Sequence, residues 1–96
     1  MANQTSEVLE TFFEETIQNM ERQFTSHEFF LKLAHAHQNE YVAALASYTS
    51  PFKDLHYDLV KRLRKLDGKL ISLQKTDYPS RDIFGIASTT TLWRKK

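Results

Sequence analysis

The hydrophobic period of this chain changes at Gly68, and that change restricts the fold more than any other feature. Over residues 51–66 the apolar side chains recur every three or four positions, the spacing of a helix with one buried face. These positions are Phe52, Leu55, Leu59, Leu63 and Leu66. Beyond Gly68 the apolar and polar residues alternate, as in a strand with one buried face. The sequence therefore predicts a helix followed directly by β-structure.

Both ends of the helix at residues 51–66 are marked by residue type. Ser50 suits the N-cap, and Pro51 suits the first helical position, where its missing N–H has no helical partner to lose. Asp67 and Gly68 close the helix, because glycine takes the left-handed conformation without strain. The face opposite the apolar stripe carries Lys53, Tyr57, Lys61 and Arg64, flanked by Arg62 and Lys65.

Two strand-like runs follow Gly68, at residues 70–74 and 89–94, and their alternation and β-branched content favour strands. Pro79 and Gly85 interrupt the segment between them. We expect a loop at residues 76–86, with Ile83-Phe84 returning to the core.

The N-terminal part of the chain also has a helical period. Over residues 6–24 the apolar positions are Leu9, Phe13, Ile17, Met20 and Phe24. Val8 and Phe12 widen this stripe beyond what one core requires. We therefore predict one N-terminal helix, in which Val8, Leu9, Phe12 and Phe13 form a protein interface that supports a homodimer.

A second helix begins at Thr25, where Thr25 and Glu28 match the capping box. Residues 37–39 read His-Gln-Asn and leave two alternatives open. One helix runs to about Ser47, or a short turn intervenes with Asn39 as the N-cap of another helix. We favour the turn, because asparagine is a poor residue in a helix interior and a good cap.

The formal net charge of +1 conceals two oppositely charged halves. Residues 1–48 contain seven acidic side chains and two basic ones, whereas residues 49–96 contain eleven basic side chains and five aspartates. A basic half of this kind suits a polyanionic partner. Charge separation can equally serve self-association.

Several functional classes find no support in the residues. The 96 residues contain no cysteine, so disulfides and thiolate metal sites are excluded, and one domain is expected. The acidic N-terminal region differs from a signal peptide, and no apolar window approaches membrane-spanning length. His35 and His37 would point apart on a helix, and no nucleophile or phosphate-loop motif occurs. We therefore expect a cytoplasmic protein without membrane contact, bound metal, cofactor or enzymatic activity.

The order of elements predicted over residues 26–94 is helix, turn, helix, short connection, basic helix and two strands. This order resembles the winged helix-turn-helix family. The resemblance implies an α+β domain with three to four helices followed by a C-terminal two- or three-stranded antiparallel β-ribbon, in which residues 6–24 add a helix to a core of residues 26–96. It also implies that helix 51–66 lies in the major groove of double-stranded DNA, with a wing at residues 74–88 beside it.

On this basis the chain is predicted to be a small regulatory DNA-binding protein. The residues predicted to contact nucleic acid are Lys53, Tyr57, Lys61, Arg62, Arg64, Lys75 and Arg81, with Lys75, Tyr78 and Arg81 at the wing tip. Asp54 and Asp58 lie beside this face, and Asp58 can pair with Arg62 at i+4. The alternatives are a solvated helix face, whose cations offset the helix dipole, and a protein-interaction or dimerisation module.

Overall fold

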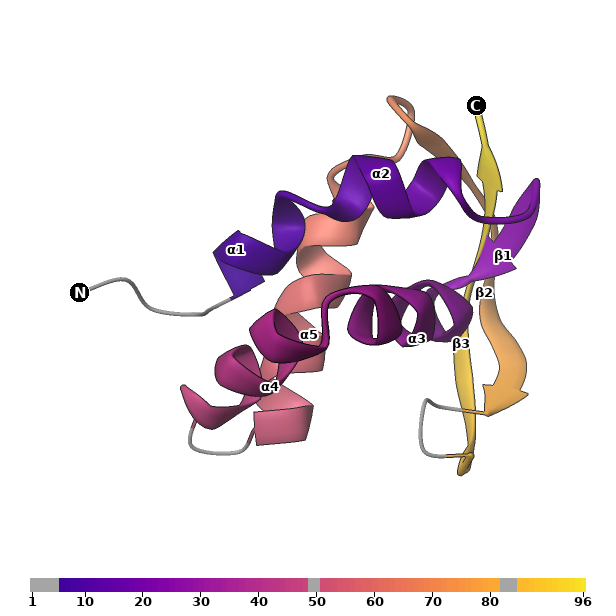
Figure 1. Cartoon of the computed structure of the whole chain (residues 1–96). Helices are drawn as coiled ribbons and strands as arrows, with labels where there is room; N and C mark the ends of the chain where they lie inside the picture. Colours follow the sequence, from indigo (N-terminus) through magenta and orange to yellow (C-terminus); the bar gives the residue numbers. More distant parts are fainter. Residues whose placement is uncertain (1–5, 49–50, 82–84) are drawn as a thin grey trace.

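A layer of helices covers one face of a three-stranded antiparallel sheet (Figure 1). The structure is a computed structural model that describes residues 6–48, 51–81 and 85–96. In chain order its elements are α1 (Ser6–Glu10), α2 (Phe13–Gln18), β1 (Gln23–Thr25), α3 (Ser26–Ala36), α4 (Gln38–Ala46), α5 (Pro51–Arg64), β2 (Ile71–Arg81) and β3 (Ala87–Lys95). The α+β class with a C-terminal antiparallel ribbon is confirmed.

The sheet has the order β1-β3-β2, so its central strand is the last one in the chain. β3 pairs with β2 along most of its length and with β1 through Phe24 and Trp93. β1 comes from the N-terminal half and was not predicted, because three residues are too few to show an alternating pattern. β1 therefore links the N-terminal half of the chain to β3, the last strand.

One apolar cluster joins the helices to the sheet. Trp93 is 2% exposed, and its Nε1 donates to Ser26 Oγ at 2.9 Å. Phe29 meets Phe13 edge-on at 5.0 Å between ring centres and lies beside Phe24 at 6.0 Å. These contacts hold the start of α3 against β1 and β3, and the satisfied indole N–H removes the cost of burying a polar group there.

The capping box at the start of α3 is confirmed. The Glu28 amide donates to Thr25 Oγ1 at 3.0 Å, and the Thr25 amide donates to Glu28 Oε1 at 2.8 Å. Two amides at the helix start thus have partners within four residues of chain. This local closure explains why the helix start was predictable without knowledge of the tertiary structure.

The turn between α3 and α4 is also confirmed, but it is centred on His37, and Asn39 is not the N-cap. The His37 amide donates to Leu33 O, and its carbonyl accepts from the Tyr41 amide, so the chain bends at a single residue. The His37 ring stacks on Phe12 at 3.7 Å with an interplanar angle of 8°. The bend thus coincides with a contact to Phe12, in the turn between α1 and α2, and not with the capping preference of Asn39.

The prediction of one helix over residues 6–24 was wrong. α1 ends at Glu10, where Thr11 Oγ1 donates to Val8 O at 2.6 Å and the Thr11 amide bonds to the same carbonyl. α2 ends at Gln18, whose carbonyl accepts from Lys95 Nζ at 3.2 Å. The turn between the helices is too short to shift the phase of the apolar residues, so periodicity alone did not reveal it.

Residues 76–86 were predicted to form a loop, but β2 continues through most of that segment to Arg81. The pairing with β3 shifts register between Lys75 and Tyr78, where Asp77 has φ +52°. Such an irregularity inserts residues into one strand while the ladder resumes beyond it. Pro79 is tolerated because β2 lies at the sheet edge. Ile83 and Phe84 lie outside the described residues.

α5 begins at Pro51 and ends at Arg64, close to the predicted limits of 51 and 66. Gly68 has φ +83°, the left-handed conformation predicted for the residue that closes the helix. The predicted cap Ser50 lies outside the described residues.

Candidate nucleic-acid interface

The two faces of α5 have opposite environments. Leu55, Leu59 and Leu63 are fully buried. The side chains predicted to face solvent, Lys53, Tyr57, Lys61 and Arg64, are all exposed. Tyr57 is 67% exposed, and Lys61 Nζ lies 5.1 Å from the centre of its ring, within the range of a cation–π contact. These four residues are referred to below as the α5 face.

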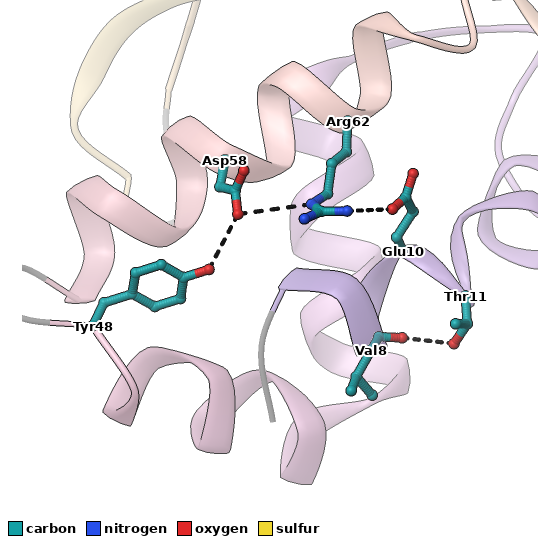
Figure 2. A network of polar contacts seen from close by, with 6 residues as sticks. All are labelled: Val8, Glu10, Thr11, Tyr48, Asp58 and Arg62. Carbon is teal, nitrogen blue, oxygen red and sulfur yellow. Dashed lines mark hydrogen bonds and ion pairs between the residues drawn. The ribbon is translucent and has the colours of Figure 1, made fainter. Parts of the chain in front are cut away.

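Arg62 was predicted to contact nucleic acid with the α5 face, but it points to another flank of the helix. Figure 2 shows its guanidinium between Glu10 of α1 and Asp58 of α5. Nη1 donates to Glu10, and Nε lies 3.7 Å from Asp58, which also accepts from Tyr48 Oη at 3.2 Å. The i+4 pairing of Asp58 with Arg62 is thus confirmed, and both charges are balanced within the chain.

The surroundings of Arg62 keep it charged. Burial alone would lower the pKa of Arg62, but the hydrogen bond to Glu10 and the negative charges of Asp58 and Glu10 raise it above its usual value. A phosphate would have to displace two carboxylates to reach this guanidinium. We therefore remove Arg62 from the candidate interface.

The other residues predicted to contact nucleic acid lie on β2, at different distances from the end of the ribbon. Lys75 is exposed but pairs with Leu92 well inside the ribbon, so the prediction that it lies at the wing tip was wrong. Tyr78 pairs with Thr90 and is half-buried. Arg81 pairs with Ala87 near the turn, and its Nη1 donates to Gly85 O at 2.8 Å. Arg81 alone occupies the predicted position near the tip.

A pocket of about 350 Å³ lies between α5 and the ribbon. Tyr57 and Arg64 line it from α5, whereas Thr76 and Asp77 line it from β2. His27 and Phe30 of α3 and four consecutive residues of β3, Ser88 to Thr91, complete much of the wall. The structure thus brings part of the α5 face to the ribbon, while Lys53, Lys61, Lys75 and Arg81 do not line this pocket.

Sequence reasoning missed this pocket because its walls come from four elements. Its aromatic side includes His56, whose ring meets Phe30 at 5.4 Å and shares a hydrogen bond with Tyr41 through Nε2. Burial raises the pKa of Tyr41 to about 12, so its phenol is protonated at neutral pH. His56 lies beside the apolar stripe of α5 and is half-buried.

The four residues of the predicted protein interface in residues 6–24 do not form one exposed surface. Leu9 is 0% exposed and Phe13 is 2% exposed, because both lie in the core. Phe12 is half-buried against His37, and Val8 is half-buried on α1. Including Leu9 and Phe13 in an exposed surface was therefore wrong. Of the two residues that widened the apolar stripe, Phe12 packs against the core of its own chain.

Within residues 6–48, 51–81 and 85–96, no three side chains of the metal-ligating types come together. No helix in that part of the chain has the length and apolar character needed to cross a membrane. Comparison with protein-family models, curated proteins and solved structures yields no match to this chain.

Proposed function

We propose that this chain is a small regulatory DNA-binding protein that contacts double-stranded DNA through the α5 face and the β2–β3 ribbon. The observation that carries this proposal is the separation of charge on α5. Lys53, Lys61 and Arg64 are exposed on one face and have no ion pair among the described residues. Exposed cations on a rigid helix can neutralise phosphates without first breaking internal pairs.

The acidic residues of α5 do not cancel this face. Asp58 is bound to Arg62 and Tyr48, on the flank that faces α1 and α4. Asp54 is half-buried in the first turn of the helix, where a negative charge is favoured by the helix dipole. The repulsion that two aspartates would exert on phosphate is therefore reduced at the α5 face.

The order of the elements and the charge of the ribbon give further support. From α3 to β3 the elements follow the order that the winged helix-turn-helix resemblance implies. Exposed Lys75 and Arg81 add two cations on β2. In the proposed complex α5 enters the major groove, and the ribbon contacts the adjacent backbone. As part of the same proposal, the protein regulates transcription and is located in the cytoplasm.

A homodimer through the N-terminal helices is the second candidate. It would have to rest on Val8 and Phe12, since Leu9 and Phe13 are committed to the core. Sedimentation at high protein concentration distinguishes the two: a clean monomer that binds DNA removes the dimer and leaves the first proposal intact.

The decisive experiment is a fluorescence-anisotropy titration of a random-sequence duplex at several salt concentrations. Each phosphate contact contributes about 0.9 to the slope of log K against log salt. The double variant Lys61→Gln/Arg64→Gln should therefore reduce the slope by about 1.8. Its fold should be retained, because both side chains point away from the buried leucines.

The matched control is Arg22→Gln/Lys32→Gln, which removes two exposed positive charges from the acidic half of the chain. We expect the control to keep the wild-type salt slope. Failure of the wild-type protein to bind random duplex even at low salt would overturn the proposal, since the electrostatic part of binding does not depend on base sequence.

A further inference from the structure

The pocket between α5 and the ribbon has features that the binding of a DNA backbone alone does not require. Its volume of about 350 Å³ lies in the range of small-molecule sites, which extends from roughly 300 to 1,000 Å³. It lies between helices on one side and the ribbon on the other. Phosphate groups on a duplex surface are met by exposed cations and need no such depression.

The helical side of the pocket is aromatic. Phe30 is 1% exposed and contacts the His56 ring edge-on at 5.4 Å. Tyr57 stands at the same pocket with 67% of its surface exposed. The hydrogen bond between Tyr41 Oη and His56 Nε2 holds His56 in place, so this wall is preorganised. Tyr57 is the exposed ring of this wall and offers stacking surface to a planar heteroaromatic group, whereas Phe30 supports the wall from the core.

The ribbon side of the pocket carries hydroxyl groups. Thr76, Ser88 and Thr89 are exposed there, and each hydroxyl can donate and accept a hydrogen bond. His27 also lines the pocket, and its buried Nδ1 has no hydrogen-bond partner in the described part of the chain. Buried polar atoms in proteins are normally satisfied, so this nitrogen has unused hydrogen-bonding capacity at the pocket.

One cation and one anion line the pocket from different elements. Arg64 lines it from α5, and Asp77 lines it from the bulged part of β2. A guanidinium suits a phosphate, whereas a carboxylate suits an amino group on a ring edge. A phosphate in this pocket is therefore favoured near Arg64, with the ring edge nearer the ribbon.

We infer that this pocket holds one unpaired nucleotide, its base between the aromatic wall and the ribbon hydroxyls and its phosphate at Arg64. A base inside a duplex cannot enter, because its faces and its edge are occupied by its neighbours and its partner. The nucleotide can come from a DNA strand with an unpaired position or from a free nucleoside monophosphate. The DNA source rests on the proposed function, whereas the free source does not.

The test compares three fluorescent probes by anisotropy: a paired duplex, the same duplex with one bulged thymidine, and the single strand. Thymidine monophosphate is titrated separately by calorimetry. We expect the bulged duplex to bind at least about fivefold more tightly than the paired one, the lower end of what stacking one base on an aromatic side chain contributes.

The variant Thr89→Phe fills the pocket without changing charge, at an exposed strand position that tolerates an aromatic residue. It should abolish the preference for the bulged over the paired duplex. Gln74→Phe is the matched control, because Gln74 is exposed on the ribbon and does not line the pocket. Thr89→Val, which keeps the shape and removes the hydroxyl, provides a second test if the larger side chain disturbs folding.

Each outcome has a defined meaning. Loss of the bulge preference in Thr89→Phe but not in Gln74→Phe supports an unpaired nucleotide of DNA. Binding of thymidine monophosphate that Thr89→Phe abolishes, with no bulge preference, supports the pocket with a free nucleotide as its source. Equal binding of all DNA probes with no nucleotide binding overturns the pocket assignment and leaves the proposed function standing. Absence of binding to every probe overturns both.

Discussion

Arg62 and Arg64 lie on the same helix, yet the structure gives them opposite surroundings. Arg62 is held between Glu10 and Asp58 on the flank that packs toward α1 and α4. Arg64 is exposed on the other flank, at the pocket beside the ribbon. The number of cations in a helix is therefore not the number that a partner can reach. What separates the two residues is the position of α1, a segment more than fifty residues earlier in the chain.

Both flanks depend on the buried stripe of α5, and its disruption should have the largest effect. Leu59 is 0% exposed, so Leu59→Ala removes buried methyl groups and leaves a cavity. We expect the free energy of unfolding to fall by about 3 kcal/mol. Chemical denaturation measures this loss. Val42→Ala is the control, since Val42 is 62% exposed and its truncation should change stability by less than about 0.5 kcal/mol.

The contrast between the two arginines can be tested directly with the same substitution. Arg62→Gln should lower the free energy of unfolding by about 1 kcal/mol, because it leaves Glu10 and Asp58 without their cation, and should leave the salt slope of DNA binding unchanged. Arg64→Gln should reduce that slope by about 0.9 with little loss of stability. The reverse pattern would show that Arg62 is the residue that meets phosphate.

The smallest expected effect concerns Tyr41, which shares a hydrogen bond with the pocket residue His56. Because burial raises the pKa of Tyr41 to about 12 from an unfolded value near 10, the unfolded chain loses this proton first as pH rises. Stability from this group should be complete below pH 10 and should decline as pH rises toward 12. Denaturation curves of wild type and Tyr41→Phe at several alkaline pH values measure it. Equal pH dependence in both proteins would contradict the assignment.

Much of the fold was predictable, because the signals involved are local. The capping box of α3 closes within four residues, and the period of α5 appears in consecutive turns of one helix. The left-handed Gly68 follows from the need to end α5 before a strand. The exposure of the α5 face was also predictable, since residues opposite a buried stripe point outward.

The errors occurred where the local pattern carries no signal or where a distant contact outweighs it. Residues 6–24 keep one apolar phase across two helices, so the turn after Glu10 left no trace in the period. The bend at His37 coincides with its stack on Phe12, and His37, not Asn39, is the N-cap of α4. The bulged continuation of β2 is supported by its pairing with β3, which outweighs the break expected from Pro79.

By itself the sequence determined the helix before the ribbon, the apolar and basic faces of α5, and the cap of α3, because each depends on residues within a few positions of one another. Only the tertiary structure decided that Gln23–Thr25 completes the sheet, that Glu10 binds Arg62, and that a pocket opens beside Arg64. Glu10 and Arg62 are 52 positions apart, and Ser26 and Trp93 are 67 apart. Such pairs meet because burial of the shared core brings their elements together, and no local preference of either residue encodes the partner.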